Sequence, residues 1–286
     1  EKSSLPAVKN VNFDVEKGEI FGMIGADGAG KTSIFRMLTT LLLPDSGSAK
    51  VLGYDVVKDY QEIRKEVGYM PGRFSLYQDL SVEENLNFYA TLFGTTVEEN
   101  IDLIRDIYVQ IEPFKKRRAG KLSGGMKQKL ALCCALIHKP RVLFLDEPTT
   151  GIDPVSRKEL WEMLRKLKQE DIAILVSTPY MDEALQCDRI GLMKNGEMMK
   201  IGTPQNMINS YYKPLYAVYS DNIFHLLQIL EKYPNRINSY AFGDKVHVIV
   251  DKSEKELFDY LTEKNFKDIQ IEKIKPTVED CFIDLS

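Results

Sequence analysis

Residues 25–32 constrain the fold of this chain more than any other stretch. They read Gly-Ala-Asp-Gly-Ala-Gly-Lys-Thr and lie between an apolar run over 19–24 and helical apolar spacing over 33–38. Glycines let the backbone curl tightly, so that several N–H groups point to one place, and the following helix adds the positive end of its dipole. This order of strand, glycine-rich turn and helix predicts a phosphate-binding loop (P-loop).

The residue types in the loop assign roles within that site. Lys31 would reach the outer phosphates, and the hydroxyl of Thr32 would ligate a magnesium ion. Asp27, about 8 Å from a phosphate charge, would be repelled by roughly 2 kcal/mol at a dielectric near 20, which the N–H groups, Lys31 and magnesium outweigh; alternatively, Asp27 caps the loop and faces away. The predicted nucleotide-binding residues are Gly25, Ala26, Asp27, Gly28, Ala29, Gly30, Lys31, Thr32 and Ser33.

Two adjacent carboxylates follow the continuous apolar run 142–145, which is typical of a buried central strand in a parallel sheet. Acids at the end of a buried strand are costly unless a cation or substrate uses them. We therefore predict that Asp146 binds magnesium, directly or through water, together with Thr32, and that Glu147 is the catalytic residue that aligns the attacking water. The alternative is a strand end capped by solvated acids.

A second candidate anion site begins a helix at Ser123, Gly124 and Gly125. Consecutive glycines behind a serine cap leave free N–H groups at a helix start. One chain has no need of two distant phosphate-binding helix ends, whereas two chains facing head to tail do. These residues are therefore predicted to complete the nucleotide site of a partner, unless the Ser-Gly-Gly start is accidental.

Composition limits the classes of protein to consider. The chain has 286 residues and a net charge of -4, which gives no reason to expect nucleic acid as a partner. No window approaches the roughly 18 apolar residues that span a bilayer, so any membrane role would depend on another subunit. The chain begins with neither an initiator Met nor a signal peptide, and we expect it to be part of a longer protein. Its cysteines are predicted to be reduced and buried: Cys133, Cys134, Cys187 and Cys281.

The order of predicted elements divides the chain into two domains. Alternating strands and helices over 1–212, with a strand at 8–14 and a mostly helical subdomain at about 76–139, predict an α/β fold. Residues 213–286 read as strand, helix, strand, strand, helix, strand, which is the order of a small α+β ferredoxin-like domain. Within the first domain, helices are expected at 81–93, 97–111 and 159–169.

In this order and spacing, the three motifs resemble those of ATP-binding-cassette (ABC) ATPases, over roughly residues 5–210. Residues 25–32 match the Walker A motif, 122–126 the signature motif and 142–147 the Walker B motif. The resemblance implies a P-loop NTPase fold and places Asp153 in the D-loop, at the seam of a dimer. The tail at 276–282 is similar to the accessory C-terminal domain of drug and antibiotic exporters.

Two positions depart from the pattern of this family. Where the resemblance implies a Gln that contacts metal and water, the chain has Gly72, and where it implies a switch His, the chain has Pro179. Neither side chain offers a donor or acceptor. His138 cannot replace the switch His, because it precedes the strand at 142–145 and is expected at a helix C-terminus. Since losing a positioned acid or base costs about 10²- to 10⁴-fold in rate, we predict slow hydrolysis at this site, unless a group from a partner substitutes.

The resemblance implies the ATP-binding subunit of an export-type ABC transporter. Such a subunit binds and hydrolyses Mg-ATP as a dimer with a second ABC ATPase domain, in the same polypeptide or another chain. It drives an integral membrane permease at the cytoplasmic face of the cell membrane, and in this family Phe74 and Tyr77 would border the permease groove, unless they are packing residues. The alternatives are a catalytically weak nucleotide-binding regulatory module and a soluble ABC ATPase that acts on ribosomes or DNA, which the acidic balance disfavours.

Overall fold

The computed structural model describes residues 6–251, 253–264, 266 and 269–285. The chain divides into two compact units, one ending at Pro204 and one spanning Gln205–Leu285. This division falls before residue 212 because α7 (Pro204–Asn209) belongs, from Gln205 on, to the second unit. Met207 is buried there, and its carbonyl accepts a hydrogen bond from the Cys281 thiol at 3.5 Å. Among the described residues, no helix has both the length and the apolar character to span a membrane.

The first unit is built on a six-stranded sheet with the order β4-β5-β6-β1-β7-β8. All neighbouring strands are parallel except β7 and β8. The carboxyl ends of β4, β5, β6 and β1 therefore meet at one edge of the sheet, where the loops that follow them gather. The strands are β1 (Ile20–Ile24), β4 (Val67–Met70), β5 (Val142–Asp146), β6 (Ala173–Thr178), β7 (Arg189–Lys194) and β8 (Glu197–Gly202).

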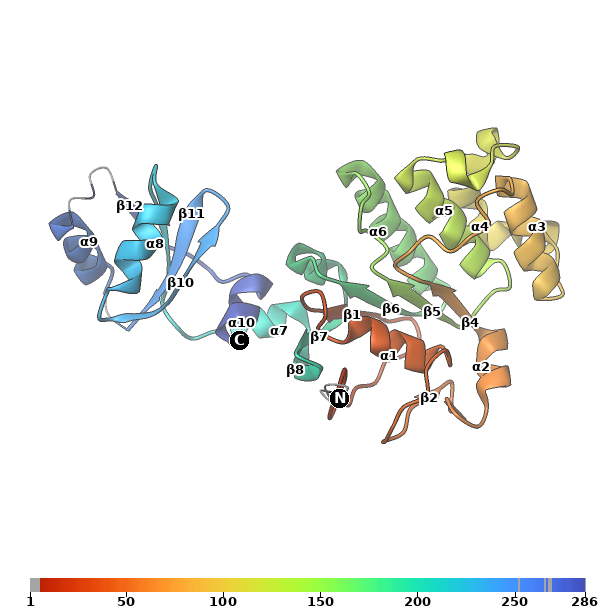
Figure 1. Ribbon diagram of the computed structural model, residues 1–286, viewed down its shortest axis with the longest axis horizontal. Helices are drawn as coiled ribbons and strands as arrows, with labels where there is room; N and C mark the ends of the chain where they lie inside the picture. The colour runs from red at the N-terminus through yellow and green to blue at the C-terminus, as the bar shows by residue number, and fades with distance from the viewer. Residues whose placement is uncertain (1–5, 252, 265, 267–268, 286) are drawn as a thin grey trace, which may run out of the picture. The chain divides into compact units, whose positions relative to one another are not determined.

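Helices cover both faces of this sheet, as expected for strands whose residues are apolar on both sides (Figure 1). Two helices lie on one face, α1 (Lys31–Leu38) and α2 (Tyr60–Glu66), and two on the other, α5 (Gly124–Leu136) and α6 (Pro154–Gln169). The helical subdomain contains α3 (Val82–Leu92) and α4 (Val97–Ile111), each of which starts at a complete capping box, as the sequence predicts for α3. The smaller elements are β2 (Lys50–Val51), β3 (Tyr54–Asp55), η1 (Glu112–Phe114), η2 (Ala119–Lys121) and η3 (Met181–Gln186).

The strand predicted at 8–14 is wrong. This segment pairs with no strand among the described residues, and its backbone contact there is the bond from Lys9 N–H to Gly196 O, at 2.8 Å. Its apolar side chains pack instead against the core of the sheet, where Phe13 stacks on Phe21 with ring centroids 5.3 Å apart. The alternating pattern therefore reflects burial of one side of an extended segment, not strand pairing.

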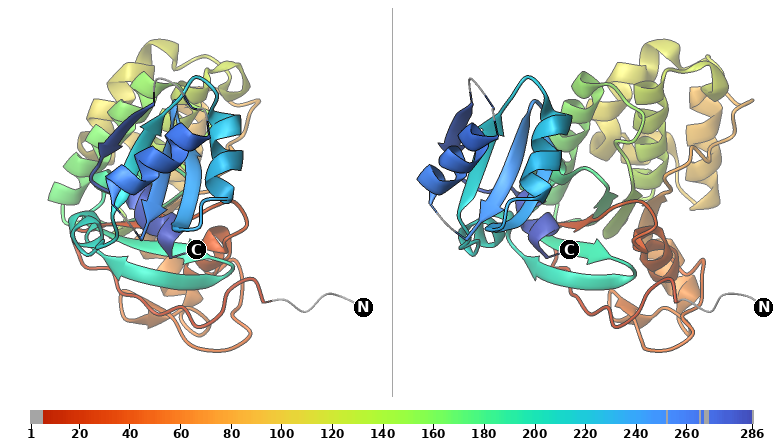
Figure 2. Two further views of the ribbon diagram at one scale, coloured as in Figure 1. Left: turned by 90° about the vertical axis from the view of Figure 1, so that its left-hand side faces the viewer. Right: turned by 60° about the vertical axis from the view of Figure 1, so that its left-hand side comes forward.

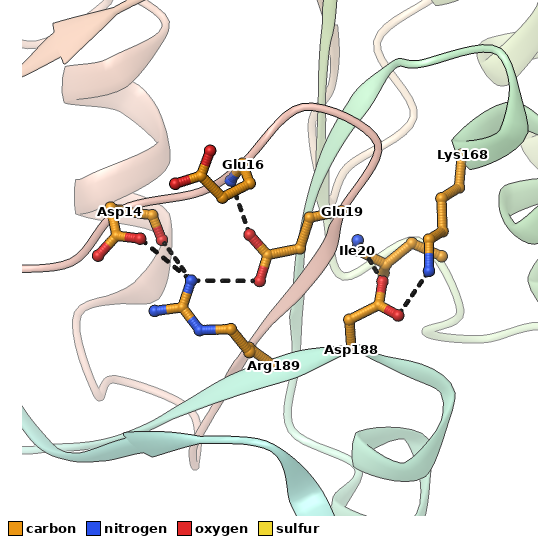
Figure 3. A network of polar contacts seen from close by, with 7 residues as sticks. All are labelled: Asp14, Glu16, Glu19, Ile20, Lys168, Asp188 and Arg189. Atoms are coloured by element: carbon orange, nitrogen blue, oxygen red, sulfur yellow. Dashed lines mark hydrogen bonds and ion pairs between the residues drawn. The ribbon is translucent and has the colours of Figure 1, made fainter.

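A polar network fixes the amino ends of β1 and β7, opposite the loop edge (Figure 3). Arg189 Nη1 lies 3.1 Å from Asp14 Oδ2 and 3.3 Å from Glu19 Oε1. Asp188 accepts a hydrogen bond from the Ile20 N–H at 2.9 Å and from Lys168 Nζ at 2.5 Å. Because Glu19 is only 5% exposed, its pairing with Arg189 compensates a carboxylate that would otherwise be costly to bury. The network thus fixes the amino end of β1, the strand that leads into residues 25–32.

The second unit has the antiparallel strand order β10-β11-β9-β12 of a ferredoxin-like sheet. Two helices, α8 (Ile223–Glu231) and α9 (Glu254–Glu263), cover one face with buried leucines, and Figure 2 shows them beside the sheet. The remaining elements are β9 (Leu215–Tyr219), β10 (Arg236–Phe242), β11 (Lys245–Val250), β12 (Gln270–Lys273) and α10 (Val278–Asp284). All four cysteines of the chain are free and buried, as predicted.

A fully buried carboxylate ties α10 to the sheet of this second unit. Asp280 Oδ1 accepts hydrogen bonds from the Tyr240 hydroxyl and from His247 Nδ1, each at 2.6 Å. Its Oδ2 accepts bonds from the N–H and the hydroxyl of Thr277, at 2.6 and 2.7 Å. Burial by itself would raise the pKa of Asp280, but the bonds from His247, Tyr240 and Thr277 outweigh it and lower the pKa below its ordinary value.

We expect Asp280→Asn to destabilise the second unit by about 2 kcal/mol near neutral pH, because it removes the charge that these donors surround. Because the pKa of Asp280 is lower in the folded state, its ionised carboxylate stabilises the fold at pH values above the unfolded-state pKa of about 4. This stabilisation is lost as the pH falls further. The deficit of the variant should therefore shrink in acid. Hydrogen exchange of the β11 amides, corrected for intrinsic rates, measures this loss of stability at each pH. Asp244→Asn, at an exposed position, is the control. A deficit that persists in acid would contradict the charge argument.

Candidate nucleotide-binding site

The loop between β1 and α1 presents a ring of free backbone donors. The N–H groups of Gly28, Gly30, Lys31 and Thr32 donate no hydrogen bond within the described part of the chain. Gly28 and Gly30 have φ values of +79° and +102°, and a Cβ atom on Gly30 would lie 2.6 Å from the carbonyl oxygen of Ala7. Only glycine fits this conformation and this close approach. The loop is therefore shaped to surround an anion with N–H groups.

The predicted lysine, threonine and carboxylates come together at this loop from two strand ends. Lys31 is 3% exposed, and its Nζ donates to the carbonyls of Gly25 at 2.7 Å and Ala26 at 3.0 Å. The same Nζ lies 3.6 Å from Glu147 Oε1. Thr32 Oγ1 donates to Asp146 Oδ1 at 3.2 Å. A hydroxyl and a carboxylate separated by more than a hundred residues thus share one side of the loop.

Ser177, at the carboxyl end of β6, contacts both carboxylate residues. Its hydroxyl donates to Asp146 Oδ1 at 2.5 Å and accepts from the Glu147 N–H at 3.0 Å. Glu147 has a φ of +51°, a left-handed conformation that is unusual for a residue with a side chain. Ser177 was not among the site residues predicted from the sequence. The feature that could have indicated it is the change from the apolar run 172–176 to two hydroxyl residues, Ser177 and Thr178.

Asp27 does not cap the loop. It is exposed, and its carboxylate accepts no hydrogen bond within the described residues. The cap proposed as the alternative role of Asp27 is therefore not formed within the described residues. The conformation of the loop depends on its glycines and on the bond from Gly196 N–H to Ala29 O, at 3.0 Å.

The two departures from the family pattern lie at the same sheet edge. Gly72 follows β4, and a Cβ atom at this position would lie 3.1 Å from the carbonyl oxygen of Asp146. Pro179 follows β6, next to Thr178, which is fully buried. His138 lies just after the C-terminus of α5, as predicted, where its Nε2 faces Val67 O at the amino end of β4, at 3.1 Å, and its ring stacks on Phe93.

The Ser-Gly-Gly start of α5 packs against the turn that begins α6, not against the P-loop. Ser123 caps α5 by accepting from the Met126 N–H at 3.3 Å. A Cβ atom on Gly125 would lie 2.4 Å from Ser156 Oγ, so only glycine allows this approach. Asp153 caps α6 by accepting from the Val155 and Ser156 N–H groups. The exposed Ser123 and Gly124 and the capping residue Asp153 therefore form a second group of candidate residues.

The fold and the loop together define a P-loop nucleotide-binding domain. Residues 8–150, about half of the chain, match the family model described as ABC transporter. The chain belongs to the ABC transporter family.

Relatives that are named ATP-binding proteins of exporters agree with this assignment. A probable multidrug ABC transporter ATP-binding protein of Escherichia coli, YbhF, is 42% identical over 98% of this chain and 49% of its own length. The chain thus spans about half the length of this relative. Nod factor export ATP-binding protein I of a Rhizobium species is 35% identical over 80% of this chain and 77% of its own. The dimeric cassette MJ0796 superposes with a TM-score of 0.62 and 25% identity, over 69% of this chain and 90% of its own.

Proposed function

We propose that this chain is the ATP-binding domain of an export-type ABC transporter, and that it binds and hydrolyses Mg-ATP. The observation that carries the proposal is the convergence of Lys31, Thr32, Asp146 and Glu147 at a loop of free N–H groups. Export is supported by the similarity to the multidrug and Nod factor export proteins. Titration with ATP, with and without Mg²⁺, followed by assay of phosphate release, tests the proposal.

The residues present fit a magnesium ion. Mg²⁺ prefers hard oxygen ligands, and it keeps several waters beside one or two protein ligands and the phosphates. Thr32 Oγ1 and Asp146 Oδ1, 3.2 Å apart, supply such oxygens next to the loop. When bound, the ion would neutralise charge on the β- and γ-phosphates.

The ammonium of Lys31 and the carboxylate of Glu147 would then act on the nucleotide. The ammonium of Lys31 is held by the carbonyls of Gly25 and Ala26, so it is positioned to transfer its hydrogen bonds to phosphate oxygens. The side chain of Glu147 is a quarter exposed, so water can reach its carboxylate. Glu147 would orient that water and accept its proton.

Hydrolysis at this site is proposed to be slow, because Gly72 and Pro179 supply no side-chain donor or acceptor at the two positions where the family has a Gln and a switch His. Replacing Gly72 by Gln is not a clean test, because its Cβ atom would lie 3.1 Å from the Asp146 carbonyl oxygen and would crowd the site. The second position is open to a test, because Pro179 follows the last residue of β6 and is not fully buried.

We expect Pro179→His to raise ATP turnover by about 10²-fold, because it adds a side chain that can donate to the γ-phosphate. Steady-state phosphate release measures the effect. Pro113→His, in an exposed turn of the helical subdomain, is the matched control and should leave the rate unchanged. Equal turnover in natural chain and Pro179→His would indicate that another group already performs this role.

A second ABC ATPase domain, in the same polypeptide or another chain, is proposed as the partner. Ser123, Gly124 and Gly125 would close the nucleotide site of that partner, with Asp153 at the seam. Support comes from the packing of the α5 start against the turn that begins α6 of its own chain and from the dimeric state of the MJ0796 cassette. An intact signature beside a weakened switch region favours an asymmetric dimer. Symmetric homodimers with two equally active sites would contradict this arrangement.

The export relatives support a further partner, an integral membrane permease, which would hold the domain at the cytoplasmic face of the cell membrane. Tyr77 and Phe88 offer it an apolar contact, because they are 51% and 40% exposed and their rings meet edge to face at 4.9 Å. Phe74 lies next to Lys127, whose Nζ is 5.5 Å from the ring centroid. Loss of permease co-purification in Tyr77→Asp, with ATP binding retained, tests this contact.

A further inference from the structure

Within the proposed ATPase site, on which this inference rests, we propose that Ser177 is the positioning residue for both carboxylates. Its hydroxyl has one proton to donate and lone pairs to accept with. The proton goes to Asp146 Oδ1 at 2.5 Å, and a lone pair accepts the Glu147 N–H at 3.0 Å. A single buried hydroxyl therefore links the side chain of one residue to the backbone of the next.

The first consequence concerns the magnesium ligand. Asp146 Oδ1 receives two hydroxyl donors, Thr32 Oγ1 and Ser177 Oγ, whereas its Oδ2 accepts no hydrogen bond within the described residues. Thr32 is itself a proposed metal ligand, so its hydroxyl would give up the bond to Asp146 in order to contact the ion. Ser177 is fully buried and has no access to phosphate or solvent, so its bond stays in place. It keeps the carboxylate in the orientation that the ion requires.

The second consequence concerns the backbone of Glu147. A non-glycine residue at φ +51° persists only where its surroundings hold it. Ser177 provides that restraint twice, since the Glu147 N–H donates to its hydroxyl at 3.0 Å and to its carbonyl oxygen at 3.1 Å. Through these bonds, the end of β6 sets the direction in which the Glu147 side chain leaves the strand.

The alternative is that Ser177 is an ordinary buried serine whose hydroxyl only satisfies its own hydrogen bonds. Removing such a group would lower the stability of the whole unit and weaken nucleotide binding equally with and without metal. A positioning role has a different result. It affects the gain in ATP affinity that Mg²⁺ provides, and it leaves metal-free binding unchanged, because Lys31 and the loop N–H groups do not contact Ser177.

The test compares ATP affinity in excess EDTA and in excess Mg²⁺ by calorimetric titration. We expect Ser177→Ala to retain the metal-free affinity and to reduce the gain from Mg²⁺ by about tenfold, the range found when ligand-orienting groups are removed. Ser177→Thr keeps the hydroxyl and should restore the gain. Ser177→Cys keeps a similar size with a weak donor and should lose the gain like Ala, which keeps the test valid if Ser177→Ala folds poorly.

Thr39→Val is the matched control, because Thr39 is a buried residue of the same unit whose hydroxyl bonds only to α1 carbonyls, at 2.8 Å from Phe35 O. It should leave both affinities unchanged. A full Mg²⁺ gain in Ser177→Ala and Ser177→Cys would overturn the positioning role alone, and so would an equal loss in EDTA and Mg²⁺. Absence of ATP binding by the natural chain would instead overturn the proposed function, and with it this inference.

Discussion

Glu147→Gln is expected to lower ATP turnover by about 10²- to 10⁴-fold while ATP affinity stays close to that of the natural chain. Glutamine keeps the size of the side chain, but it cannot accept a proton from water. The binding groups remain, because Lys31 keeps its bonds to the loop carbonyls and Thr32 keeps its bond to Asp146. Single-turnover phosphate release and calorimetric ATP titration measure the two quantities separately.

The same substitution in a Pro179→His background provides a larger measurable range, since the natural site is proposed to be slow. Glu159→Gln is the matched control. Glu159 lies on α6, outside the site, and forms an ion pair with Lys129 of α5 at 2.6 Å. It should leave turnover unchanged. If Glu147→Gln also hydrolysed ATP at the natural rate, the measured activity would come from another residue, and the assignment of Glu147 would fail.

Lys31→Ala is expected to weaken ATP binding by about 100-fold, which corresponds to about 2.8 kcal/mol. The ammonium is 3% exposed and aims at the loop, so its bonds to phosphate would be charge-assisted and little screened by solvent. The substitution also leaves Glu147 without the cation that lies 3.6 Å from it, which increases the repulsion of a polyanion. Calorimetric titration with Mg-ATP measures the loss.

Two substitutions define the specificity of this effect. Lys17→Ala removes an equal charge from an exposed pair with Asp171 and should not change ATP affinity. Lys31→Arg keeps the charge, but the guanidinium is larger and planar and does not fit the buried loop, so we expect it to weaken binding as well. Undiminished affinity in Lys31→Ala would mean that the nucleotide does not occupy this loop.

The elements with local chemical signatures were predicted closely. A capping box at Ser81 and apolar spacing over 97–111 located α3 and α4, because caps and helical periodicity depend on residues a few positions apart. The strand order of the second unit also agrees with the predicted ferredoxin-like sheet. The start of α6 was predicted too late, at residue 159, since the sequence analysis did not use the cap formed by Asp153 and the proline that follows it.

The elements that depend on distant partners were predicted less well. The pair β7 and β8 was not identified, and residues 8–14 were predicted as a strand that the structure does not contain. Local alternation reports which side chains are buried, but strand formation also requires a neighbouring strand with free hydrogen-bonding groups. That neighbour cannot be found from a short window of sequence.

The sequence by itself determined the loop chemistry at 25–32, the carboxylates at 146 and 147, and the absence of a side-chain donor or acceptor at 72 and 179. Each is a choice of residue type that is visible without coordinates. Only the tertiary structure brought Ser177 into one cluster with Thr32 and Asp146, because β1, β5 and β6 become neighbours through long crossovers. The physical reason is that parallel strands gather their carboxyl ends at one edge, while the order of the strands depends on packing across the whole domain.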